Sequence, residues 1–178
     1  ENIKSNHGRT LEYVQVYMTL DGYSAKVIRE YYTHLAGSPS RLQSSTRYIE
    51  YGDFDFIVPP KIAFNPNFEE KYSDCMKRIS ETIKELENAG VPREDASMLL
   101  PLGMTTKVVV RTNLRNLIDM SRQRECSRAF WEYRQLFSDI KKALSEVSEE
   151  WKEVVDMTFH PKCEELGRCP EVHGCGRY

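Results

Sequence analysis

A chain of 178 residues with a formal net charge of −2 is long enough for one folded domain and has no basic excess, which argues against bulk binding to nucleic acid. Its hydrophobic content of 40% and charged content of 29% are ordinary for a globular protein. No apolar run approaches the roughly 20 residues of a membrane span, and no signal-peptide pattern opens the chain. The sequence therefore predicts neither a nucleic-acid nor a membrane partner. Because the chain starts at Glu1 rather than methionine, the presence of a preceding segment is left open.

The first part of the chain is expected to mix strands and one helix. Alternating apolar positions predict a strand over 11–19, closed by a turn at Asp21-Gly22. A helical period follows over 23–35, and 37–40 has the composition of a loop. Residues 48–58 are then expected to be extended.

The second part is expected to be mostly helical. Apolar side chains spaced three or four apart predict the clearest helix over 68–89, ended by Gly90. The Thr- and Val-rich segment 104–112 predicts a strand. Helical spacing resumes over 113–123 and continues as a long amphipathic helix over 127–147. Strands and helices thus mix without a regular βαβ repeat, so the sequence predicts an α+β fold.

The end of the chain is rich in cysteine. Cys163, Cys169 and Cys175, with two nearby histidines, could hold a tetrahedral zinc. Their spacing lacks the Cys-x2-Cys knuckle of common zinc sites, so we predict no metal and keep zinc as the minor alternative. Cys75 and Cys126 lie in helical contexts and are expected to be buried or incidental thiols. A reduced, cytoplasmic protein is the simplest expectation.

The segment from Arg41 to Tyr48 offers the groups that bind a nucleotide phosphate. Hydroxyls and backbone amides at Ser45 and Thr46 could wrap the phosphate, and Arg47 could neutralise it. A guanidinium presents a planar fork of donors that matches phosphate or a uracil carbonyl edge. From the spacing alone, a polar turn with solvated arginines remains the simpler interpretation.

The helix expected after Asn113 is a second candidate wall for a nucleotide. Asn113 could cap this helix and leave backbone amides beside a ligand phosphate. Arg115, Asp119 and Arg122 fall four and three positions apart and share one face, whereas Arg124 points elsewhere. The alternative is an ordinary cap followed by an Arg–Asp surface pair.

Other chemical signatures are weak or missing. His7 and Glu12, near the start of the chain, indicate no function by themselves. A histidine placed as His34 is, near the end of a helix, is more often a surface or helix-end residue than a catalyst. The sequence has no P-loop, no Gly-rich dinucleotide fingerprint and no pattern of a Ser or Cys nucleophile with its base. Function must therefore come from the two nucleotide-like segments.

Taken together, these segments resemble the flavin-dependent thymidylate synthases. The most specific pieces are Ser45-Thr-Arg-Tyr48, Pro92-Arg-Glu94 followed by Leu99-Leu-Pro101, and Thr112-Asn-Leu-Arg115 running to Arg124. Three motifs in matching order are much harder to obtain by chance than any one of them. The likeness covers nearly the whole chain, and the cysteine-containing tail is similar to tails on some members.

The resemblance implies a catalytic domain over 1–158, with a central, mostly antiparallel sheet flanked by long helices, and a cysteine-rich tail over 159–178. It also implies a homotetramer, with sites shared between subunits, that converts dUMP to dTMP using FAD, NADPH and methylenetetrahydrofolate. In such enzymes the reduced flavin supplies hydride, and the protein orients and polarises the uracil. This sequence offers arginines but no convincing nucleophile, which fits an enzyme whose cofactor does the chemistry and whose protein binds and polarises the substrate.

Site residues follow by matching positions. The resemblance gives Arg124 the contact with the uracil ring, which makes it the catalytic candidate. The dUMP positions are Gln43, Ser45, Thr46, Arg47 and Arg124. The flavin-side positions are His7, Glu12, His34, Asn113, Arg115 and Asp119.

Several positions depart from the family pattern. Thr33-His34-Leu35 stands where the family has Arg-His-Arg, and Gln43 replaces a glutamate. Ser97 stands where the family usually has an arginine that reaches the dUMP phosphate from a neighbouring subunit. Asp119 replaces a neutral or basic residue on the flavin side. Two alternatives therefore stay open: a related enzyme that 5-hydroxymethylates a pyrimidine nucleotide, and a non-catalytic nucleotide-binding relative.

Overall fold

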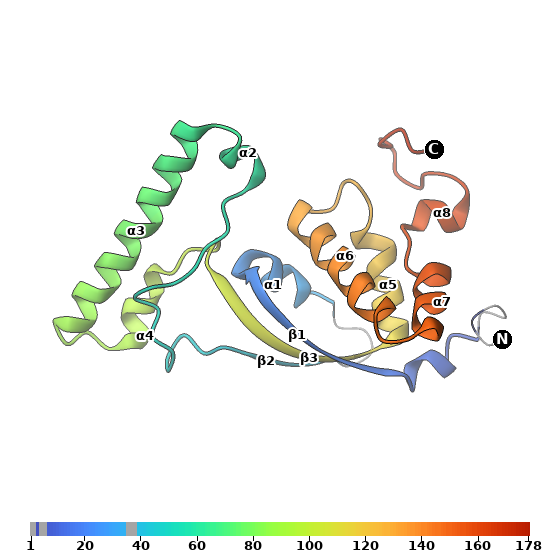
Figure 1. The fold of residues 1–178 in the computed structure, drawn as a ribbon, viewed down its shortest axis with the longest axis horizontal. Helices are drawn as coiled ribbons and strands as arrows, with labels where there is room; N and C mark the ends of the chain where they lie inside the picture. The colour runs from blue at the N-terminus through green and yellow to red at the C-terminus, as the bar shows by residue number, and fades with distance from the viewer. Residues whose placement is uncertain (1–2, 4–6, 35–38) are drawn as a thin grey trace. The chain divides into compact units, whose positions relative to one another are not determined.

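The computed structural model describes residue 3, residues 7–34 and residues 39–178 (Figure 1). These residues divide into two compact units, which we describe separately. The C-terminal unit takes Glu1–Met18, His34–Ser40 and Val110–Tyr178, and the central unit takes Thr19–Thr33 and Arg41–Val109.

The strands form one small antiparallel sheet in the order β1-β3-β2. β1 is Gln15–Ser24, β2 is Ser40–Gln43 and β3 is Thr105–Asn113. Every second side chain of β3 from Thr106 to Thr112 is buried, as the period of two requires for a strand with one covered face. The predicted α+β class is therefore confirmed, and the strand predicted over 104–112 is shifted by one residue.

The predictions for the first part of the chain were wrong in three places. Thr10–Glu12 forms a short 3-10 helix, η1, so β1 begins later than predicted. The turn expected at Asp21-Gly22 lies inside β1, because Gly22 takes a φ of 76°, which a residue without a side chain adopts at little cost. Residues 48–58 form no strand beyond one isolated bridge, Phe56 to Met104. Of the predicted loop over 37–40, Ser40 opens β2 and positions 37 and 38 lie outside the described residues.

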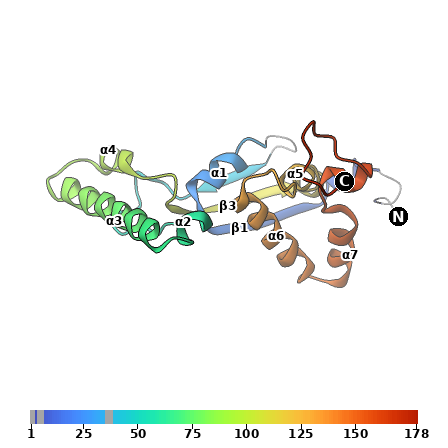
Figure 2. The same ribbon diagram turned by 90° about the horizontal axis from the view of Figure 1, so that it is seen from above.

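The C-terminal unit is built from helices. They are α5 (Leu114–Arg124), α6 (Trp131–Ser145), α7 (Glu149–Thr158) and the short α8 (Lys162–Leu166). α6 contacts both α5 and α7 (Figures 1 and 2). Its inward residues Tyr133, Leu136 and Phe137 are fully buried. α6 starts four residues later than the predicted helix over 127–147.

The central unit contains α1 (Ala25–Tyr31), α2 (Pro60–Ala63), α3 (Pro66–Asn88), α4 (Arg93–Ala96) and the 3-10 turn η2 (Ser97–Leu99). The long helix predicted over 68–89 is confirmed as α3, with Met76 and Ile83 buried. Gly90, at a φ of 90°, follows its end. α1 begins two residues later than the predicted 23–35, because the Ser24 hydroxyl caps it by accepting a hydrogen bond from Val27 N at 3.2 Å, and it ends at Tyr31.

All five cysteines are free thiols. Of the two expectations for these thiols, buried or incidental, burial does not hold for Cys75, which is exposed on α3, and Cys126 is half-buried. Among the described helices, none combines the length and the apolar character needed to cross a membrane.

Candidate functional site

Arg124, the catalytic candidate, is held by two aromatic side chains of its own unit. It lies at the end of α5, and its Nε donates a hydrogen bond to His34 Nε2 at 2.9 Å. Its guanidinium carbon also lies 4.5 Å from the ring centroid of the buried Tyr133, in a cation–π contact. His34 and Tyr133 pack edge to face with centroids 6.1 Å apart. The structure therefore joins two predicted site residues, His34 and Arg124, around a tyrosine that the sequence did not single out.

The residue after Arg124 fixes the end of the same helix. Glu125 is only 15% exposed, and its Oε2 lies 2.7 Å from Lys141 Nζ on α6. Burial raises the pKa of the Glu125 carboxyl, and the hydrogen bond from Lys141 opposes that effect. Lys141 also donates to the Phe159 carbonyl at 2.8 Å, which ties the end of α5 to α6 and to the end of α7.

A second cluster lies at the start of α5. Asn113 caps the helix as predicted, because its side-chain oxygen accepts a hydrogen bond from Asn116 N at 2.8 Å. Arg115, half-exposed, forms an ion pair with Glu12 at 2.5 Å. A Cβ at Gly8 would lie 3.6 Å from the Arg115 guanidinium, so the chain before η1 passes close to this cation. The structure thus brings together Glu12, Asn113 and Arg115 of the predicted flavin positions.

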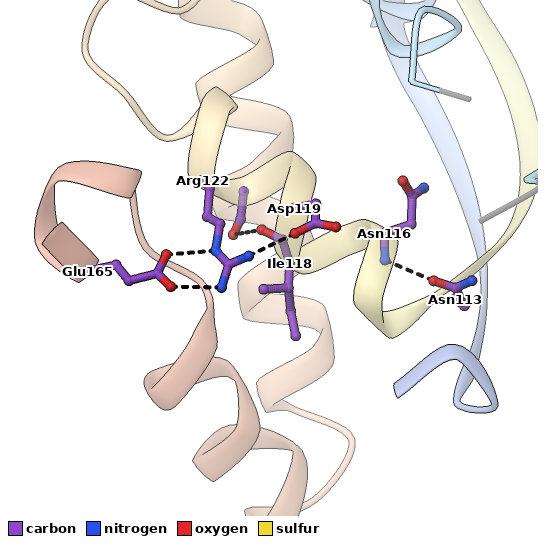
Figure 3. A network of polar contacts seen from close by, with 7 residues as sticks. Asn113, Asn116, Ile118, Asp119, Arg122 and Glu165 are labelled. Carbon is purple, nitrogen blue, oxygen red and sulfur yellow. Dashed lines mark hydrogen bonds and ion pairs between the residues drawn. The ribbon is translucent and has the colours of Figure 1, made fainter. Parts of the chain in front are cut away.

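The remaining flavin-side residues behave differently. The side chain of His7 is exposed, and its carbonyl accepts hydrogen bonds from the backbone and the hydroxyl of Thr10. Asp119 faces Arg122 rather than Arg115, with Oδ1 2.8 Å from Arg122 Nη1 (Figure 3). Arg122 also pairs with Glu165 of α8, where Nε and Oε2 lie 2.9 Å apart. The Arg–Asp surface pair that we set against a ligand site is therefore present in part of this helix.

The predicted phosphate segment lies in the central unit and is polar and open. Gln43 Nε2 donates to Thr106 Oγ1 at 3.3 Å, which holds the end of β2 to β3. Ser45 Oγ accepts a hydrogen bond from Arg47 N at 3.2 Å and so shapes the turn. Thr46 is exposed at the tip of that turn. The geometry matches the polar turn expected from the sequence.

Arg47 already has an anionic partner. Its Nε lies 2.9 Å from Glu94 Oε2, and the two side chains are 63% and 55% exposed. Arg93 donates to the Tyr48 carbonyl at 3.2 Å. The structure therefore brings the Ser45–Tyr48 and Pro92–Glu94 motifs together within one unit.

The cysteine tail gathers no metal site. Within the described residues, which include Cys163, Cys169 and Cys175, no group of three or more His, Cys, Asp or Glu side chains is placed to hold a metal ion. The minor zinc alternative thus finds no support in the geometry.

Comparison with known proteins gives a single answer. Residues 1–149 match the family model described as thymidylate synthase complementing protein. A flavin-dependent thymidylate synthase from Nitratidesulfovibrio vulgaris is 30% identical, with 99% of this chain and 74% of that relative aligned. The enzyme of that name from Thermococcus onnurineus is 33% identical, over 93% of this chain and 68% of its own length. The chain belongs to the flavin-dependent thymidylate synthase family.

The structure shows what surrounds the positions at which this chain departs from the pattern of the flavin-dependent thymidylate synthases. Where the family has an Arg-His-Arg triplet, His34 is retained and is bonded to Arg124, whereas Leu35 lies outside the described residues. Ser97 Oγ donates to the Glu94 carbonyl at 3.1 Å. The acidic Asp119 is offset by Arg122, so its charge is balanced within α5.

Sequence reasoning missed the residues that position the candidates. They are Tyr133 beneath Arg124, Glu94 beside Arg47, and Glu165 beside Arg122. Tyr133 falls within the helix predicted over 127–147 without being singled out, and Glu94 entered only as part of a motif. No sequence signal pairs Glu165 with α5, because α8 reaches that helix only through the tertiary fold.

Proposed function

We propose that this chain converts dUMP to dTMP, with methylenetetrahydrofolate as the one-carbon donor and NADPH-reduced FAD as the hydride source. Family membership supports this function. The observation that carries it is the guanidinium of Arg124, held by His34 at 2.9 Å and by the Tyr133 ring at 4.5 Å. An arginine fixed in this way can polarise a uracil carbonyl without first reorganising.

On the nucleotide side, we assign the dUMP phosphate to Arg47 with the amides and hydroxyls of Ser45 and Thr46. Arg47 is exposed and paired with a carboxylate that is itself exposed, so a phosphate dianion can replace Glu94 at little cost. Gln43 is assigned to the same nucleotide from the adjoining end of β2. Arg124 is assigned to the uracil ring, where its donors stabilise negative charge that develops on the carbonyl oxygen.

On the flavin side, the donor set fits an anionic cofactor. Arg115 offers an exposed cation in the first turn of α5, and the Asn113 cap orders that helix end. We assign His7, Glu12, His34, Asn113, Arg115 and Asp119 to this side. Bound and reduced FAD would supply the hydride, for which the chain has no group of its own. The chain itself contributes binding, orientation and polarisation.

We further propose a homotetramer, with sites shared between subunits, acting in the cytoplasm. Large apolar side chains left exposed on the single chain support association, among them Tyr17, Leu42 and Met98. The free thiols support a reducing compartment. Light scattering after size exclusion tests the assembly, and a monomer at working concentration would contradict it.

The function is tested by anaerobic bleaching of the flavin absorbance with NADPH, with and without dUMP, followed by mass analysis of the product after folate is added. We expect bleaching and a product of the mass of dTMP. A product heavier by one oxygen atom would indicate the 5-hydroxymethylating alternative. Protein that stays colourless after addition of FAD would indicate the non-catalytic relative.

A further inference from the structure

The tail reaches the helix that carries Arg124. Glu165 on α8 faces Arg122 side-on, with Arg122 Nε 2.9 Å from Glu165 Oε2 and Nη2 donating to Oε1 at 3.1 Å (Figure 3). Of these two contacts, the one from Nη2 has the geometry of a hydrogen bond and the one from Nε is an ion-pair contact, so Glu165 holds Arg122 by charge and by one hydrogen bond. The same guanidinium donates to Asp119 at 2.8 Å, one turn back on α5.

Arg122 and Arg124 share the last turn of α5. The last turn of a helix frays readily, because its final carbonyls have no partners within the helix. Here Glu165 holds Arg122, two residues before Arg124, and Lys141 holds Glu125, the residue after Arg124, at 2.7 Å. Arg124 therefore lies between two residues that are each held by an ion pair. The rotation of this last turn of α5 determines whether the Arg124 side chain points toward His34 and Tyr133.

The tail and the end of α5 also line a common cavity of about 690 Å³, to which Arg124 contributes. Two of the arginines that line it are paired with carboxylates of the tail: Arg128 with Glu171, and Arg177 with Glu164, each at 2.9 Å. These pairs hold the tail in place beside the end of α5. The cavity therefore lies where the tail packs beside this end of α5.

We propose that Glu165 is a positioning residue, which acts through Arg122 to hold the Arg124 guanidinium against His34 and Tyr133. Its consequence for catalysis rests on the proposed function of Arg124. The family model matches residues 1–149, so this role belongs to a part of the chain that the match does not cover.

The direct test measures the position of Arg124 without using activity. The full-length protein is treated with phenylglyoxal, and the rate of labelling at Arg124 is followed by mass spectrometry. Glu165→Gln should raise that rate about threefold, a modest change because a half-exposed ion pair contributes little. Glu165→Asp, which keeps the charge, should restore most of the protection.

The matched control is Glu164→Gln on the same helix. Glu164 and Glu165 are 42% and 45% exposed, but Glu164 forms its ion pair with Arg177 of the tail and acts on the end of α5 only through the smallest of the charge effects on Glu125. Labelling of Arg124 in this variant should match that of the wild type. An unchanged rate in Glu165→Gln, or an equal rise in both variants, would overturn the inference.

A second readout links position to chemistry. In Glu165→Gln, kcat for dTMP formation should fall about threefold, while NADPH oxidation without dUMP stays at the wild-type rate. Equal losses in both reactions would show a general structural effect and overturn the positioning role. Wild-type protein that makes no dTMP refutes the proposed function, whereas the labelling result still decides the role of Glu165.

Discussion

The two arginines assigned to dUMP are held in opposite ways. Arg124, in the C-terminal unit, is half-buried against the Tyr133 ring and bonded to His34. Arg47, in the central unit, is 63% exposed and paired with an exposed carboxylate, and its guanidinium lies 5.6 Å from the Tyr48 ring centroid. The first arrangement suits a group that must already be oriented when charge develops. The second suits a group that captures an anion from solvent by exchanging one partner for another.

The largest effect should come from the fixed arginine. Arg124→Ala should lower kcat for dTMP formation by about 10²- to 10³-fold, the usual result of removing one preorganised donor. Steady-state assays and light scattering check the rate and the assembly, which should be intact. Arg78→Ala, on exposed α3, controls for loss of an arginine in general. Turnover close to wild type in Arg124→Ala would remove this arginine from catalysis.

A smaller loss is expected at the exchangeable arginine. Arg47→Lys should weaken dUMP binding about tenfold, because lysine keeps the charge but loses the planar fork. Calorimetric titration with dUMP measures the affinity, and kcat at saturating dUMP should change little. An unchanged affinity would place the phosphate elsewhere.

The partner of Arg47 gives a test with the opposite sign. Glu94→Gln removes the carboxylate that competes with phosphate, so dUMP should bind about two- to threefold more tightly. The effect should shrink at high salt, which screens exposed charges. Weaker binding in Glu94→Gln would mean that Glu94 orients Arg47 for the phosphate.

The smallest effect concerns a tail thiol. A hydrogen bond from the Ser127 hydroxyl, followed by one from the Arg177 backbone, lowers the pKa of the Cys175 thiol. The thiolate is therefore present at lower pH than in a free cysteine, so alkylation by iodoacetamide should persist as pH falls. Mass spectrometry across a pH series, with N-acetylcysteine as reference, measures this. Ser127→Ala should shift the profile toward the reference, and identical profiles for both proteins would contradict the assignment.

The sequence predicted those elements whose signals are local. α3 follows from apolar residues at helical spacing, and Asn113 is a cap by its residue type and its place before the helix. β1 was misplaced, because Asp21-Gly22 has the composition of a turn and yet continues the strand through a positive φ at Gly22. Composition gives the conformations a residue can adopt, and pairing with β3 decides which one it takes.

The sequence by itself determined the family, the α+β class and the identity of the candidate arginines, because motifs and periodicity are carried by neighbouring residues. Only the tertiary structure decided what each arginine faces. Arg124 and His34 are 90 positions apart, and Arg115 and Glu12 are 103 apart. Helical spacing fixes the side of α5 on which a guanidinium projects. The partner that comes to meet it is set by long-range packing, which no local pattern records.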